Sequence, residues 1–153
     1  MLKYIGTIIV FLFVSLLYGT MVQEKKLGDL LPDADHIFIG HVIKVDMVDR
    51  KGHLITDNKA RTGPGLKNTI RLHVKVKKVL HTTSKETPDI IIIKLWDMWH
   101  YSLGQIKRAA KNERAIYLLK GPNYEIVFPR HFTRPLHEKK AIIEYIDKKK
   151  SVK

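Results

Sequence analysis

The chain of 153 residues contains 28 lysines and arginines against 15 aspartates and glutamates, and it has no cysteine. The lack of cysteine excludes a disulfide framework and a thiolate metal site, and about 130 residues beyond the N-terminal segment are enough for one domain but too few for two. A formal net charge of +13 favours anionic partners such as lipid head groups, anionic polymers or an acidic protein.

The N-terminal segment has the pattern of an export signal. Lys3 precedes an apolar run from Tyr4 to Tyr18, and small residues follow from Gly19. This order of a cation, a short apolar stretch and a small residue predicts a helical signal peptide over residues 1–19. Residues 4–22 approach the roughly 20 residues that a helix needs to cross a bilayer, so an uncleaved membrane anchor is the alternative. We therefore expect a periplasmic or secreted protein, with membrane attachment only if the segment is retained.

Three further regions follow from composition. Residues 20–33 are mostly polar and are expected to form a linker, and residues 34–146 hold the regular apolar patterns of a single domain. Residues 147–153 are rich in lysine, which predicts a solvated and irregular basic tail.

The domain is expected to begin with a bent strand and a long loop. Apolar residues on both faces predict a buried strand from His36 to Met47, with Gly40 as a bulge or bend and His41 as a core polar group. Residues 49–69 are polar and rich in glycine, and loops of this length are often binding loops or mobile segments.

The clearest alternation covers residues 70–77, where apolar residues take one face and cations take the other. The cationic face is a candidate stripe for an extended polyanion, formed by Arg71, His73, Lys75 and Lys77. The alternative is an edge strand whose lysines prevent aggregation.

Aromatic residues follow the next strand. The run Ile90–Leu95 predicts a strand buried on both faces, and Trp96, Trp99 and Tyr101 come directly after it. These aromatic side chains either close one end of the core or form an exposed stacking platform for a sugar or a base.

The last part of the domain predicts a helix and a hairpin. Ser102 and Gln105 match a capping box, which indicates a helix to about Lys111. Residues 115–119 and 124–128 are expected to pair as strands around the turn at residues 121–123. The pattern of residues 141–146 fits a strand or a helix.

These elements predict a mainly β fold, a small five-stranded OB-like barrel with a short helix between the third and fourth strands. The segment from Ala34 to Val42 is similar to the opening strand of bacterial netrin-like and metalloproteinase-inhibitor-like exported domains, and the segment from Lys111 to Leu119 resembles their fourth strand. The resemblance covers residues 33–128 and implies an OB-like barrel. Because the chain has no cysteine, the metal-gripping terminal cysteine of the eukaryotic inhibitors has no counterpart here.

Motifs of catalysis are not found in the sequence. The histidines form no metal-binding spacing, no serine lies in a GxSxG motif, and no phosphate-binding glycine loop is present. We therefore expect no enzymatic activity, no catalytic residue, no metal and no cofactor. Two hypotheses remain: a basic module that binds an anionic surface or polymer, and a protein-interaction domain, such as an envelope-assembly factor, inhibitor or immunity-type protein, that uses residues 49–69 and strand edges.

Overall fold

The computed structural model describes residues 24–110 and 113–151. The expected signal peptide over residues 1–19, and the alternative anchor over residues 4–22, lie outside these ranges. No helix in the described ranges combines the length and the apolar character that crossing a bilayer requires.

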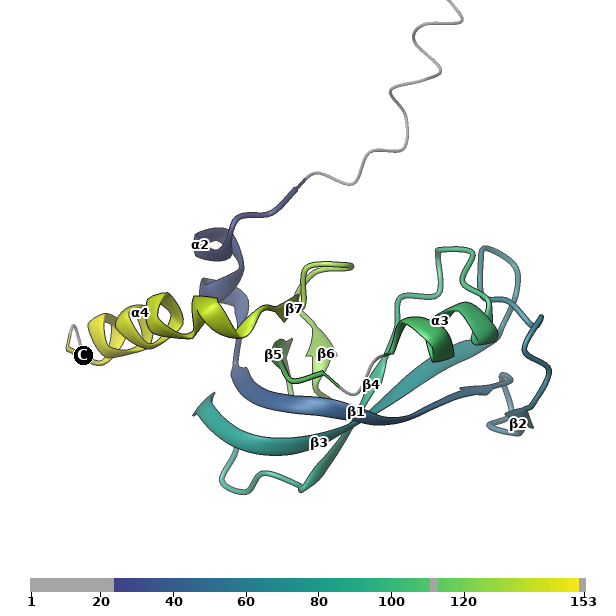
Figure 1. The fold of residues 1–153 in the computed structure, drawn as a ribbon, viewed down its shortest axis with the longest axis horizontal. Coiled ribbons are helices and arrows are strands. Elements are labelled where there is room, and N and C mark those ends of the chain that lie inside the picture. Colours follow the sequence, from purple (N-terminus) through teal and green to yellow (C-terminus); the bar gives the residue numbers. More distant parts are fainter. Residues whose placement is uncertain (1–23, 111–112, 152–153) are drawn as a thin grey trace, which may run out of the picture.

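The described residues form a mainly β structure, as predicted, built on one antiparallel sheet (Figure 1). Its central strands follow the order β4-β3-β1-β5-β6, while β2 pairs with β1 and β7 pairs with β5. The bounds of the strands are β1 His36–Val48, β2 Leu54–Ile55, β3 Thr69–Thr82, β4 Ile90–Lys94, β5 Ala115–Lys120, β6 Glu125–Ile126 and β7 Thr133–Arg134.

The prediction of a closed barrel is wrong, because the sheet stays open between its terminal strands β4 and β6. These strands have Cα atoms within 8 Å of one another, yet they form no strand pairing. The strand expected over residues 124–128 is reduced to Glu125–Ile126, since Tyr124 has a φ of 54° and Pro129 follows closely. A strand of two residues pairs with β5 and offers too little backbone to join β4 as well.

Helices cover both ends of the sheet (Figure 1). The predicted helix is confirmed as α3, and its capping box between Ser102 and Gln105 is formed. Residues expected to be a linker instead form helical turns whose Leu30 and Leu31 are buried in the core. The bounds of the helices are α2 Leu27–Leu30, η1 Leu31–Asp33, α3 Leu103–Ala109, η2 Leu136–Glu138 and α4 Lys139–Ser151.

Helix α4 resolves the open question about residues 141–146, which are helical, and corrects the expected tail. The helix runs on to Ser151, so residues 147–151 are its last turns. Ile142 and Ile146, one turn apart, are buried against the end of the sheet. The exposed lysines of the last turn are consistent with a helix C-terminus, where the helix dipole favours positive charge.

Strand β1 bends where a bulge was predicted. The pairing with β3 shifts register between Ile39 and Gly40. A Cβ atom at Gly40 would lie 2.7 Å from the carbonyl oxygen of Lys75, so only glycine permits this close approach of the two strands. The core histidine of this strand is His36, whereas the predicted one, His41, is only half-buried. The ring of His36 forms hydrogen bonds with Thr82 Oγ1 at 2.8 Å and with the Gly121 carbonyl oxygen at 3.0 Å.

The long segment at residues 49–68 is tied to helix α3. The backbone N–H groups of Leu103 and Gly104 donate to the carbonyl oxygens of Ala60 and Asn58 at 3.0 and 2.9 Å. Beneath this contact lies a small cluster of buried residues formed by Met47, Ile70 and Leu103. The segment therefore has a defined position against the sheet, which allows it to form one wall of a site.

Candidate anion-binding face

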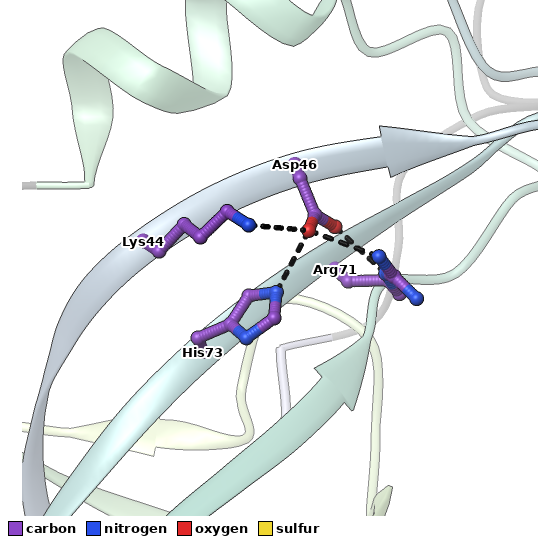
Figure 2. A network of polar contacts seen from close by, with 4 residues as sticks. All are labelled: Lys44, Asp46, Arg71 and His73. Atoms are coloured by element: carbon purple, nitrogen blue, oxygen red, sulfur yellow. Dashed lines mark hydrogen bonds and ion pairs between the residues drawn. The ribbon is translucent and has the colours of Figure 1, made fainter. Parts of the chain in front are cut away.

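A buried carboxylate organises the cations on the outer face of β1 and β3. Figure 2 shows the side chains of Lys44, Arg71 and His73 converging on Asp46. Arg71 donates from Nε to Oδ1 at 2.7 Å and from Nη2 to Oδ2 at 2.9 Å, and His73 Nε2 lies 2.9 Å from Oδ2. Lys44 Nζ lies 3.4 Å from Oδ2. The strand register creates the cluster, because it pairs Asp46 with Arg71 and Lys44 with His73.

The ionisation of Asp46 follows from these contacts. The hydrogen bonds from Arg71 lower the pKa of Asp46 from 3.8 to about 2, and those from His73 add to this effect, although burial alone would raise it. The pKa of Arg71 is raised by the same pair. The group therefore contains one permanent anion held between Arg71 and Lys44, and its net charge is positive.

This network has the wrong composition for a metal site. Asp46 and His73 are the only metal-ligand types in it, and two cations already contact the carboxylate. Among the described residues no group of three or more histidine, aspartate or glutamate side chains could hold a metal ion.

The expected basic stripe is divided by the structure. Arg71 and His73 are half-buried and bound to Asp46, whereas Lys75 and Lys77 are exposed. The strand pairing passes from Val76 to Lys78, so Lys77 is the extra residue of a bulge. The alternative interpretation of an edge strand is wrong, because β3 lies between β1 and β4.

Strand β4 brings a further cation to the stripe. Its expected burial on both faces is wrong: Ile91 and Ile93 are buried, while Ile90 and Ile92 are each 45% exposed. Lys94 points to the same side as these two and pairs in register with Arg71. Strand β4 is therefore an edge strand with one core face and one open face of mixed apolar and cationic character.

A cavity of about 730 Å³ opens beside Arg71, between residues 49–69 and the chain after β4. Four cations and two carboxylates lie among its lining residues. Asp49 is engaged locally, since it accepts bonds from the backbone N–H groups of Lys51 and His53 at 2.8 and 2.9 Å. The bond from the His53 backbone lowers the pKa of Asp49. The charged lining residues are Asp49, Arg50, Lys67, Arg71, Lys94 and Asp97.

A second cavity, of about 550 Å³, lies on the other side of Arg71, across β4 toward the turn at residues 121–124. Arg71 and Lys94 line both cavities, and Glu125 lies in the second one. The cations Arg50, Lys67 and Lys94 were missed by sequence reasoning because they come from three separate segments. Only the outward position of Lys94, next to a cationic strand, could have been a signal.

The aromatic residues after β4 form a cluster of their own. The rings of Trp96 and Trp99 meet edge-on with their centres 5.2 Å apart, and the rings of Trp99 and Tyr101 do so with their centres 5.8 Å apart. The Arg130 guanidinium lies 5.5 Å from the centre of the Trp99 ring. Trp96 is 42% exposed, while Trp99 and Tyr101 are half-buried, and burial raises the pKa of Tyr101. Thr62 Oγ1 donates to the Trp99 carbonyl oxygen at 2.6 Å.

This arrangement separates the aromatic cluster from the basic stripe. Neither tryptophan lines the two cavities at Arg71, and Tyr101 lines a different cavity of about 540 Å³, together with Ile106 and Phe132. The edge-on rings contact each other, and the hydrogen bond from Thr62 to the Trp99 carbonyl oxygen anchors the long loop to the chain after β4. The two sets of predicted site residues are thus not combined in one pocket.

Comparison of the chain with known proteins finds no match: no family model, no curated protein and no solved structure is similar to it at a significant level.

Proposed function

We propose that the protein is a non-enzymatic binding module that holds an extended anionic ligand across the outer face of β3 and β4. The observation that supports this most directly is the position of Arg71 and Lys94, which line both cavities. A ligand that follows them passes from the loop at residues 49–69, over the two strands, to the turn at residues 121–124. That path suits a polymer better than a small compact anion.

The connectivity of the strands supports an OB-like relationship, although the sheet is not closed. Strand β1 pairs with β3 and β5, and β3 also pairs with β4. Helix α3 lies between β4 and β5 in the chain. OB folds bind oligonucleotides and oligosaccharides on the face of their second and third strands, between the first and last connecting loops. In this chain β3 and β4 hold those places.

Asp46 contributes to this site by holding Arg71. A guanidinium has five N–H donors, and the two bonds to Asp46 use only two of them. The remaining edge can therefore meet a phosphate, sulfate or carboxylate without first losing side-chain freedom. With the export signal proposed for residues 1–19, the ligand would be an anionic polymer or surface outside the cytoplasm.

Paired substitutions of equal charge test this proposal. Lys67→Gln with Lys94→Gln removes two cations from the cavity, and Lys140→Gln with Lys148→Gln removes two exposed cations from α4. With polyphosphate and a sulfated glycan as probes, we expect the first pair to weaken binding and to reduce the slope of log affinity against log salt by about 1 per lysine. The α4 pair should have little effect. Equal losses from both pairs, or no binding to either probe, would contradict the proposal.

A second candidate function is protein binding at the edge of β4. Ile90 and Ile92 are exposed on a strand that has no pairing partner on its outer side among the described strands. An extended acidic and apolar segment of a partner could extend the sheet there and contact the neighbouring cations. A fluorescent peptide of alternating glutamate and valine provides the probe: Ile90→Ser with Ile92→Ser should abolish its binding, while the salt dependence of polyphosphate binding, which the unchanged Arg71 and Lys94 set, stays the same. If the double variant binds the peptide as well as the wild type does, this candidate fails.

A further inference from the structure

A third kind of site lies at the opposite end of the molecule from α3, where α4 packs against the sheet (Figure 1). There the structure contains a cavity of about 160 Å³ whose inner walls are hydrocarbon. Leu31, Ala34, Ile37 and Ile146 line it, and each is at most 6% exposed. The cavity is therefore a cleft into the edge of the hydrophobic core, and water inside it would find few hydrogen-bond partners.

The mouth of this cavity is positively charged. Lys149 and Lys150, from the last turn of α4, are lining residues, together with His81 of β3. Burial lowers the pKa of His81, and the charges of Lys149 and Lys150, which line the same cavity, lower it further.

The other charged groups near His81 do not reverse this field. His36 of β1 lowers the pKa of His81 further, and among the residues that the structure describes Asp35, just before β1, acts to raise it. The side chain of Asp35 already accepts a hydrogen bond from the Gly121 N–H at 2.7 Å. The mouth therefore combines an apolar interior with a cationic rim, which is complementary to an amphipathic anion.

We propose that this cavity binds a small organic anion whose apolar group enters the space between Ile37 and Ile146 while its anionic head lies between Lys149 and Lys150. The volume sets the size of the apolar group: a cavity of about 150 Å³ lined by aliphatic and aromatic side chains accepts benzene, so a six-carbon chain or a single ring fits. This site is separate from the polymer-binding face, because none of the described residues lines both.

The size of the cavity predicts how affinity depends on the length of the ligand's hydrocarbon chain. With the full-length protein and the series butanoate, hexanoate, octanoate and decanoate, affinity should rise about tenfold for each added pair of methylenes up to about six to eight carbons and then level off. The levelling follows because further methylenes stay in water once the cavity is full. Calorimetry measures the affinities, and a rise that continues unchanged to decanoate would overturn the proposal.

The charge of the mouth is tested with matched variants and matched probes. Lys149→Gln with Lys150→Gln should weaken hexanoate binding about tenfold, whereas Lys140→Gln with Lys148→Gln, which removes two exposed cations of α4 outside the cavity, should leave it unchanged. For the wild type, hexanol and hexylamine should bind at least tenfold more weakly than hexanoate. Equal binding of hexanol, or equal effects of the lysine variants, would overturn the proposal.

His81 provides a readout at the site itself. A bound carboxylate near the imidazole favours the protonated form, so hexanoate should raise the pKa of His81 and shift its ring proton signals in an NMR titration. A decrease in hexanoate affinity for Ala34→Val, which narrows the cavity and leaves both lysines in place, supports the same location. Hexanoate binding that leaves the His81 signals unmoved would place the ligand elsewhere and overturn the proposal.

Discussion

At the scale of single residues, Asp46 determines what the cations of the outer face can do. It is 6% exposed and sits opposite Arg71 in the pairing of β1 with β3. In this register Lys44 is diagonal to Arg71, so without the charge of Asp46 two cations would lie close together on neighbouring strands with no anion between them. The carboxylate thus turns a repulsive pair into an ordered group, and the guanidinium keeps a fixed direction.

Asp46→Asn should lower the free energy of unfolding at pH 7 by about 2 kcal/mol, because each unit of pKa shift corresponds to about 1.4 kcal/mol. The pKa is about 2 in the folded protein against an ordinary 3.8, so the stabilisation is complete above about pH 4 and is lost as the pH falls toward 2. Urea unfolding at pH 7 and at pH 2.5 measures both effects.

The exposed Asp89 provides the control for this prediction. Asp89→Asn should change the free energy of unfolding at pH 7 by less than about 0.5 kcal/mol. If Asp46→Asn and Asp89→Asn were equally mild, the hydrogen-bonded pair with Arg71 would not stabilise the fold.

A substitution at Gly40 tests the close contact between β1 and β3, and Gly28 provides its control. Gly40→Ala should lower the free energy of unfolding by roughly 1–3 kcal/mol, because the new Cβ would lie 2.7 Å from the Lys75 carbonyl oxygen and 2.8 Å from Val74 Cγ1. Gly28→Ala, in α2, has no neighbour within 4 Å and should be neutral or slightly stabilising. Thermal unfolding of both variants checks this, and a harmless Gly40→Ala would mean that the strands can separate at little cost.

At the scale of elements, α4 shows that a lysine-rich end can belong to the core. Its mean hydropathy is low and its last turn is cationic, yet Ile142 and Ile146 are buried at 0% and 6% exposure. A helix places residues four apart on one face, so two isoleucines are enough to bind the helix to the sheet while the lysines stay in water.

Two adjacent isoleucines of α4 provide a matched test of this packing. Ile142→Ala should destabilise the protein by about 2–5 kcal/mol, as expected for a large-to-small change in a packed core. Ile143→Ala, at a position that is 36% exposed, should cost less than about 1 kcal/mol. Chemical denaturation followed by circular dichroism measures both, and similar costs at the two positions would show that α4 is not packed as described.

At the scale of the whole molecule, one continuous hydrophobic cluster links α4 to the central sheet. It includes Ile142 at the α4 end, Phe38 and Leu118 in the sheet, and Leu72 nearer the α3 end, and Leu95 and Ile106 pack against it. Leu95 and Ile106 also pack against the smaller cluster beneath the long loop. The two ends of the molecule should therefore unfold together.

This continuity predicts one cooperative transition. Both tryptophans lie after β4, far along the chain from α4, so tryptophan fluorescence reports on that region, whereas far-ultraviolet circular dichroism reports on the secondary structure of the whole molecule. Their unfolding midpoints in urea should coincide, and Ile142→Ala should shift both by the same amount. A tryptophan transition that ignores Ile142→Ala would indicate two independently stable units.

Much of the secondary structure could be predicted because its signals are local. The alternation at residues 70–77 gave a core strand, Ser102 and Gln105 gave a helix start, and Gly40 gave a bulge. The predictions were wrong where contacts with residues distant in the sequence decide the local structure. Residues 20–33 were expected to be a linker because they are mostly polar, but Leu30 and Leu31 are buried by apolar contacts with segments that are distant in the sequence.

The sequence alone therefore determined the mainly β class, the positions of the long strands and of α3, and the strong positive charge, because periodicity, capping and composition are properties of neighbouring residues. Only the tertiary structure decided that the sheet stays open beside β6, that Asp46 holds Arg71, and that Arg50, Lys67 and Lys94 share one cavity. The physical reason is the same in each case: strand register and loop anchoring bring together side chains that are far apart in the chain, and a net charge contains no information about where its cations meet.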